Sequence, residues 1–323
     1  ELSIGDRCDL WFARAKLEHH QRRYDEAAQS LEKANALRRR LRPSNAVSLI
    51  ASGDDLLSLF EQAQRQSPVA ASEAHDQELP GTGCIFVVGM PRSGSTLVES
   101  ILSMRSDCEA LGETDLFPVA FRRAAQLAVA LRGSASWRLL AKKAAAGYLE
   151  GRTAAVSACT GWSTDKLLSN YNYCGHLLRA LPGAKVIHCV RHPLDVLLSI
   201  YRANFSTGMG YASCLVDGSK VYAAQARLMA AYWQAFPQQI RVVRYEELVA
   251  DPGEQVRQLV AWLGWPWDEC YLHSHRNARP VSTASVIQVR APIHAGSVGN
   301  WKRYSTMLEP ARQELERLGV PVV

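Results

Sequence analysis

The chain has 323 residues, of which 47% are apolar and 21% charged, a balance typical of globular proteins. This composition excludes a wholly disordered chain, a collagen-like fibre and a small disulfide-stapled domain. The net charge of +6 suits a nucleic-acid surface or a pocket for a multiply charged small anion, and does not distinguish them. We expect no membrane segment, because no apolar run approaches ~18–20 residues, and no secretory signal is visible.

The eight cysteines form no C-x-x-C pair, and Cys84 and Cys189 stand inside apolar runs where a thiol behaves as a small buried side chain. We therefore expect a reduced, cytoplasmic protein. The nearest approaches to metal-ligand spacing are two histidine pairs. One of them, His188 and His192, straddles a predicted strand end, so we expect no metal site.

Residues 10–40 predict two amphipathic helices that form a hairpin. The turn into the second helix, with Tyr24-Asp-Glu-Ala27, resembles one tetratricopeptide repeat. Because one repeat cannot bury its own apolar face, residues 1–45 are predicted to end a longer array. An ordinary helical hairpin is the alternative. The basic run Arg38–Arg40 is expected only to suit the dipole at the helix C-terminus.

Residues 46–82 predict a connector with one short helix over 55–60, and residues 83–323 a second domain. In that domain strands alternate with helices, which predicts an α/β fold with helices on both faces of a parallel sheet. Its predicted strands are 85–88, 184–190 and 240–243. Its predicted helices lie near 96–104, 115–131, 136–150, 168–181, 194–205, 221–236 and 253–263. Ligands bind such sheets at the carboxyl ends of strands, here the loops after residues 88, 113 and 190.

A phosphate-binding loop is predicted directly after the first strand. Residues 89–96, Gly-Met-Pro-Arg-Ser-Gly-Ser-Thr, follow the nucleotide-binding pattern G-x-x-x-x-G-K-[ST], except that Ser95 replaces the lysine. The glycines, the backbone N–H groups and the helix start still favour an oxyanion, and Arg92 adds a guanidinium fork. The missing lysine argues against an ATPase or kinase. A glycine turn without a ligand is the alternative.

A second anion site is predicted where Arg191 leaves a later strand. Pro193 suits the first position of the helix that follows, and Ser199 lies two turns into it. Arg191 and Ser199 could therefore clamp a second phosphate. The same segment also suits a plain helix start, with a surface ion pair between Arg191 and Asp195.

Together these motifs resemble the sulfotransferases that use 3′-phosphoadenosine 5′-phosphosulfate, above all tyrosylprotein sulfotransferases and bacterial relatives fused to tetratricopeptide repeats. The resemblance covers roughly residues 83 to 305 in unbroken motif order. Further matching stretches are Leu111–Thr114, Thr164–Lys166, Arg244–Leu248 and Thr283–Trp301. The resemblance implies the sulfotransferase fold, this donor with 3′-phosphoadenosine 5′-phosphate as product, and no metal. The donor carries about four negative charges, so the charge of +6 needs no nucleic acid to explain it.

The resemblance also implies a role for individual residues. Those predicted to cradle the 5′-phosphosulfate are Arg92, Ser93, Gly94, Ser95 and Thr96. Those predicted to hold the 3′-phosphate and close over the nucleotide are Arg191, Ser199, Tyr245, Ser285, Trp301 and Lys302. Glu113 is predicted to be the general base, and Lys166 and Arg92 to neutralise the leaving group. Because sulfuryl transfer, like phosphoryl transfer, has a loose in-line transition state, positioned cations do most of the work.

This chain departs from the family at two positions. Tyrosylprotein sulfotransferases have Gly-Glu-Glu-Thr where this chain has residues 112–115, Gly-Glu-Thr-Asp, so Asp115 is a second candidate base. Asn300 stands where a basic residue is usual, and Lys302 could replace it.

The acceptor group is expected to be a hydroxyl. The repeat region favours a protein or peptide as the acceptor molecule, and the acceptor pocket is expected in loops around 115–150 and 205–220. Two other functions stay open: a nucleotide-binding scaffold with an interaction module, and a P-loop kinase-like enzyme.

Overall fold

The computed structural model describes residues 2–67, 79–128, 134–156, 161–205, 208–277 and 290–322. The chain divides into two compact units, each built from segments far apart in sequence. Unit 1 comprises residues 1–53, 191–227 and 295–323, and unit 2 comprises residues 54–190 and 228–294. Within the described residues, no helix is both long and apolar enough to cross a lipid bilayer.

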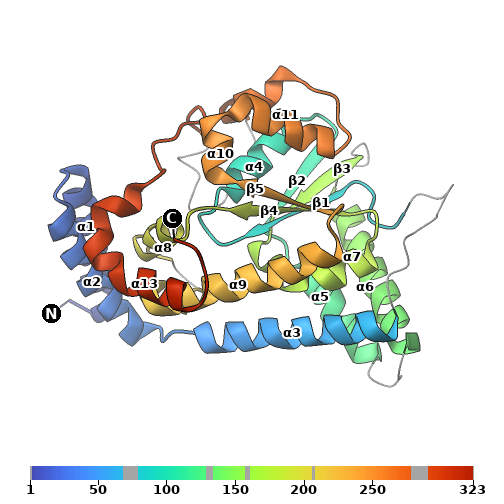
Figure 1. The fold of residues 1–323 in the computed structure, drawn as a ribbon, viewed down its shortest axis with the longest axis horizontal. Coiled ribbons are helices and arrows are strands. Elements are labelled where there is room, and N and C mark those ends of the chain that lie inside the picture. Colours follow the sequence, from blue (N-terminus) through green and yellow to red (C-terminus); the bar gives the residue numbers. More distant parts are fainter. Residues whose placement is uncertain are drawn as a thin grey trace. The chain divides into compact units, whose positions relative to one another are not determined.

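Unit 2 is built on a five-stranded parallel sheet with strand order β2-β3-β1-β4-β5 (Figure 1). The strands are β1 (Cys84–Gly89), β2 (Cys108–Gly112), β3 (Trp162–Asp165), β4 (Lys185–Val190) and β5 (Ile240–Arg244). β1 is central, with Phe86 opposite Asp165 of β3 and Val186 of β4. The predicted α/β fold with a parallel sheet is confirmed.

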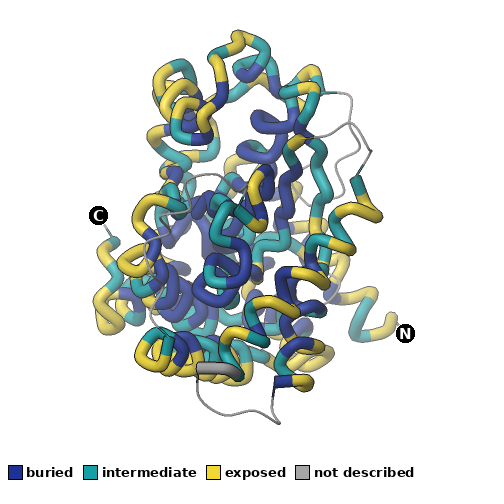
Figure 2. Tube along the Cα trace, turned by 90° about the vertical axis from the view of Figure 1, so that its right-hand side faces the viewer, coloured by how far each residue is buried: buried dark blue, intermediate teal, exposed yellow. Residues whose placement is uncertain are grey.

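Both faces of this sheet are covered by helices (Figure 1). Ile85 and Val87 of β1 belong to the core under one layer, and Phe86 and Val88 to the core under the other. The first layer holds α4 (Ser95–Leu102), α10 (Tyr245–Ala250), α11 (Pro252–Trp262) and η3 (Glu269–Arg276). The second holds α5 (Leu116–Ala128), α6 (Ser134–Ala155), η1 (Leu168–Tyr173) and α7 (Cys174–Ala180). Every residue of β1 is buried, the state coloured dark blue in Figure 2, which explains its unbroken apolar run.

Several elements differ from the sequence expectations. β2 and β3 were not among the predicted strands, because both are short and β3 has polar residues at its buried positions 163–165. The predicted connector helix is much longer than residues 55–60, since α3 runs from Ala46 to Gln66. Gly53 interrupts its apolar pattern but stays helical, at a cost of about 1 kcal/mol relative to alanine.

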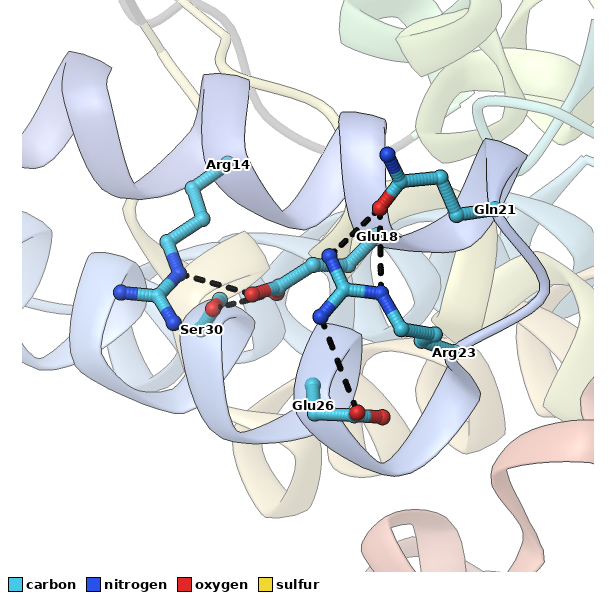
Figure 3. Close-up of polar contacts among 6 residues, drawn as sticks. All are labelled: Arg14, Glu18, Gln21, Arg23, Glu26 and Ser30. Carbon is cyan, nitrogen blue, oxygen red and sulfur yellow. Dashed lines mark hydrogen bonds and ion pairs between the residues drawn. The ribbon is translucent and has the colours of Figure 1, made fainter.

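Unit 1 contains the predicted helical hairpin, formed by α1 (Ile4–His20) and α2 (Tyr24–Leu41). Its buried Glu18 accepts hydrogen bonds from Ser30 Oγ at 2.6 Å and Arg14 Nε at 2.7 Å (Figure 3). Burial opposes ionisation of Glu18, but these two hydrogen bonds outweigh it and lower the pKa of the carboxyl. The other elements with residues in unit 1 are α8 (Pro193–Tyr201), η2 (Gly210–Ser213), the first part of α9 (Leu215–Ala235), η4 (Asn300–Tyr304) and α13 (Ser305–Arg317).

The second helix of the hairpin is hydrogen-bonded to the end of α8. Asn35 Nδ2 donates to the Tyr201 carbonyl at 3.0 Å, and the buried Arg38 donates to the carbonyls of Ala203, at 2.7 Å, and Phe205. Arg38 therefore does more than the sequence suggested, because it caps the backbone of the segment after α8. Whether the hairpin ends a repeat array, and where the domain boundaries fall, stay predictions.

Candidate functional site

The phosphate loop, residues 89–96, joins β1 to α4 through three left-handed backbone positions. Gly89, Arg92 and Gly94 have φ values of 146°, 71° and 97°. A Cβ at Gly89 would lie 2.4 Å from the Cys189 carbonyl oxygen of β4, and one at Gly94 would lie 2.7 Å from Tyr245 Cδ2. Only glycine fits these two places, while Arg92 adopts a conformation that non-glycine residues rarely take and that clusters at functional sites.

The hydroxyl side chains of the loop are suited to binding an oxyanion. Ser93, Ser95 and Thr96 are buried, and Ser93 Oγ has no hydrogen-bond partner among the described residues. A buried hydroxyl without a partner is costly unless a ligand satisfies it. Tyr245, the first residue of α10, packs its ring on Gly94 and so supports the loop from the end of β5.

Glu113 and Lys166 form an ion pair at the carboxyl ends of β2 and β3. Lys166 Nζ lies 2.7 Å from Glu113 Oε1, and the Lys166 backbone N–H donates to the Gly112 carbonyl at 2.8 Å. The Lys166 side chain is 1% exposed, whereas that of Glu113 is 47% exposed. The structure therefore brings together two residues 53 positions apart that were predicted to act on the same reaction.

Two buried carboxyl groups surround this pair, and the sequence motifs did not single out either. Glu99 Oε2, on α4, lies 3.9 Å from Lys166 Nζ. Asp165 Oδ2 accepts from Thr114 Oγ1 at 3.2 Å, and its Oδ1 accepts from the Leu167 N–H and Asn170 Nδ2. Burial raises the pKa of each carboxyl to about 7. The only sequence signal for Glu99 was a carboxylate inside an otherwise apolar helix.

In unit 1 Arg191 is held at the start of α8. Its Nη2 donates to the Ser297 carbonyl at 2.6 Å and lies 3.9 Å from Asp195 Oδ2, while Tyr222 Oη donates to the Arg191 carbonyl. Arg191 and Asp195 are both buried, so the surface ion pair offered as the alternative reading is wrong. Ser199 lies one turn beyond Asp195 on the same face of α8.

Asp195 also fixes the segment that carries Trp301. Its two oxygens accept the backbone N–H groups of Gly299 at 2.7 Å and Trp301 at 2.9 Å. The Trp301 ring stacks on His192 with centroids 5.0 Å apart. Lys302 is exposed on η4, and Asn300 Nδ2 donates to the Gly296 carbonyl at 3.1 Å. Asp195 is thus an organising residue that sequence reasoning treated only as a helix-start carboxylate.

A groove of about 720 Å³ runs between α5 and α6 in unit 2. Small residues such as Ala120 and Gly147 line it, as does Asp115, two positions after Glu113. Arg123 and Lys143 also line it. The groove lies in the region 115–150 that was expected to bind the acceptor.

Two further predictions concern Ser285 and a metal site. Ser285 lies outside the described residues. Where the chain is described, His, Cys, Asp and Glu side chains do not gather in groups of three or more that could hold a metal ion.

Comparison with known proteins identifies one family. Residues 84–269 match the sulfotransferase family. An uncharacterized protein of Aquifex aeolicus (strain VF5) is 35% identical over 250 residues, which are 73% of this chain and 33% of that protein. A protein-tyrosine sulfotransferase of Drosophila melanogaster is 24% identical over 252 residues, 71% of this chain and 48% of that protein. The chain therefore spans between a third and a half of the curated relatives it matches.

The fold is also similar to those of solved structures. The sulfotransferase domain from the olefin synthase of Synechococcus PCC 7002 superimposes with a TM-score of 0.54 at 19% identity, covering 79% of this chain and 100% of that domain.

Proposed function

The chain belongs to the sulfotransferase family, and we propose that it transfers a sulfuryl group from 3′-phosphoadenosine 5′-phosphosulfate to a hydroxyl acceptor. The observation that carries this proposal is the buried Lys166 ammonium, held 2.7 Å from Glu113 at the strand ends beside the phosphate loop. A cation and a base meet there at the place where an α/β sheet binds ligands.

The phosphate loop fits the 5′-phosphosulfate end of the donor. Backbone N–H groups at the start of α4 and the hydroxyls of Ser93, Ser95 and Thr96 would bind its oxygens, with the Arg92 guanidinium as an additional cation. The buried Ser93 hydroxyl, which has no hydrogen-bond partner among the described residues, supports an anion here. Because the loop lacks the lysine of triphosphate-binding loops, a kinase-like reaction is a weaker candidate.

In unit 1 Arg191 and Ser199 would bind the 3′-phosphate. Asp195 and the Ser297 carbonyl orient the Arg191 guanidinium, so little side-chain entropy remains to be lost on binding. Trp301 and Lys302 on η4, and Tyr245 in unit 2, would contact the nucleotide. The same role for Ser285 stays a prediction.

The reaction then needs one base and several cations. The acceptor oxygen attacks sulfur, and its proton passes to Glu113. The bond between sulfur and the bridging phosphate oxygen breaks, and 3′-phosphoadenosine 5′-phosphate leaves. Lys166 and Arg92 would stabilise the charge that develops on the leaving oxygen. Asp115 is the alternative base.

The α5–α6 groove is the proposed binding place for the body of the acceptor, because Asp115, two positions after the proposed base, lines it. A protein or peptide acceptor such as a tyrosine side chain is the finer proposal, supported by the name of the Drosophila relative. Ala146 lines the groove and is exposed, so Ala146→Trp would fill the groove without disturbing the core. We expect it to raise the acceptor KM at least tenfold, about 1.4 kcal/mol. Ala155→Trp, exposed on the same helix but outside the groove, is the matched control.

Two measurements test the function itself. Turnover of ³⁵S-labelled donor with tyrosine peptides, phenols and glycans separates an enzyme from a nucleotide-binding scaffold. A thermal shift with 3′-phosphoadenosine 5′-phosphate, compared with ATP and magnesium, separates a sulfotransferase from a kinase-like protein. Stabilisation by ATP alone, together with absent turnover, would overturn the proposal. A cytoplasmic location also stays a proposal.

A further inference from the structure

A second carboxylate lies behind the Glu113–Lys166 pair. Glu99 is buried on α4, with its Oε2 3.9 Å from Lys166 Nζ. The ammonium therefore lies between one buried and one exposed carboxyl group, whose side chains are 11% and 47% exposed. Because Lys166 itself is almost wholly shielded from water, its charge depends on these neighbours rather than on hydration.

We propose that Glu99 is a positioning residue that holds the Lys166 ammonium from the protein interior and so frees Glu113 to act as the base. The inference rests on the proposed sulfuryl transfer. While Glu113 is paired with Lys166, one of its carboxylate oxygens is occupied by the ammonium instead of being available to the acceptor's proton. When Glu113 turns to the acceptor, Glu99 still compensates the buried ammonium.

The groups that face Glu99 determine the pH range over which its carboxyl group ionises. They are Lys166 and Asp165 at the end of β3 and Glu113 after β2, together with the Thr164 hydroxyl and the Gly112 backbone. The pKa of Glu99 is raised to about 7, chiefly by burial; Lys166 opposes this shift and Glu113 adds to it. Glu99 is therefore largely neutral below pH 7 and charged above it. We expect the rate to rise with pH through this range.

The test compares pH profiles of kcat between pH 5.5 and 9 for the wild type, Glu99→Gln and Glu99→Asp. The wild type should show an acid limb with a midpoint near pH 7. Glu99→Gln should lose that limb and be about tenfold slower at pH 8. Glu99→Asp keeps a charge on a shorter side chain and should restore the limb at a lower rate.

Asp165→Asn is the control, because burial also raises the pKa of Asp165 to about 7. It should keep the limb, although it weakens the contacts of Asp165 with Thr114 and Asn170. The inference would be overturned if kcat of Glu99→Gln fell at acid pH as it does in the wild type. It would also be overturned if the midpoint of that fall shifted only in Asp165→Asn.

Binding separates failure of this inference from failure of the proposed function. If the wild type does not turn over the donor, the function fails, and calorimetry with 3′-phosphoadenosine 5′-phosphate still tests Glu99. Ionised Glu99 offsets the Lys166 charge, so the wild type should bind several-fold more weakly than Glu99→Gln at pH 8 and about equally at pH 6. Equal affinities at both pH values, or no binding by either protein, would contradict it.

Discussion

Arg191 in unit 1 and Lys166 in unit 2 are both buried cations with predicted roles toward one donor, but their partners differ. Arg191 is oriented by a backbone carbonyl and by Asp195, whose oxygens are also occupied by two backbone N–H groups. Lys166 instead has two carboxyl groups as neighbours, one of them half-exposed. The surroundings of Arg191 are therefore rigid, whereas those of Lys166 allow one partner to leave.

This difference suits the two proposed tasks. A group that only binds gains from being fixed in advance, because less entropy is lost when the ligand arrives. A group that takes part in chemistry has to change its partners during the reaction. Substitutions in the two places should therefore separate binding from turnover.

The largest effect is expected for Glu113→Gln, which keeps the shape of the side chain but cannot accept the acceptor's proton. Turnover should fall about 10²–10⁴-fold, while the affinity for 3′-phosphoadenosine 5′-phosphate stays within a few-fold. Both are measured on one preparation, with Asp115→Asn alongside. If only Asp115→Asn loses turnover, the base is Asp115, and if neither does, base catalysis from this loop is wrong.

Arg191→Ala should show the opposite pattern. It removes charge-assisted hydrogen bonds to the 3′-phosphate, so nucleotide binding should weaken by about 2–4 kcal/mol. Discrimination between 3′-phosphoadenosine 5′-phosphate and AMP should disappear in calorimetry. Because Asp195 loses its buried partner, a melting curve has to accompany the titration. Unchanged affinity for both nucleotides in a folded variant would remove Arg191 from the site.

Acid should destabilise both units through buried neutral histidines. Burial lowers the pKa of His176 in unit 2 and of His19 in unit 1 to about 4, and Arg202 adds to the effect at His19. Their ordinary value is near 6.5. Because the unfolded chain then binds more protons, this stability is complete above pH 6.5 and is lost as the pH falls toward 4.

Urea unfolding at pH 7 and pH 5 measures this effect. His176 is buried against Phe60 and Phe121 and contributes about 2 kcal/mol between these two pH values, and the more exposed His19 contributes less. His176→Gln should reduce the pH dependence more than His19→Gln, with the exposed His20→Gln as control. Equal slopes in all four proteins would show that other groups dominate.

Chelation is expected to have the smallest effect. If Arg92, Lys166 and the start of α4 neutralise the leaving group, EDTA should leave turnover unchanged. Activity lost to EDTA and restored by magnesium would instead favour the kinase-like alternative.

The local sequence was enough for the parts of the fold that depend on chain continuity. An apolar run, a glycine-rich turn and a helix start predicted β1, the phosphate loop and α4, because each is determined by backbone conformations that its own residues prefer. The strand–helix alternation likewise predicted a parallel sheet with two helical layers. β2 and β3 were missed, since both are short and become strands only through pairing, β3 with β1 and β2 with β3.

By itself the sequence therefore determined the order of the elements, the glycine positions of the phosphate loop and the residue types offered for binding and chemistry. Only the tertiary structure decided how these residues are paired and shielded. It buried Asp195 under the backbone of residues 299–301, turned Arg38 into a cap for carbonyls after α8, and set Glu99 behind Lys166. Burial and polar contacts depend on segments that can lie 165 residues apart, and no local pattern records which of them will meet.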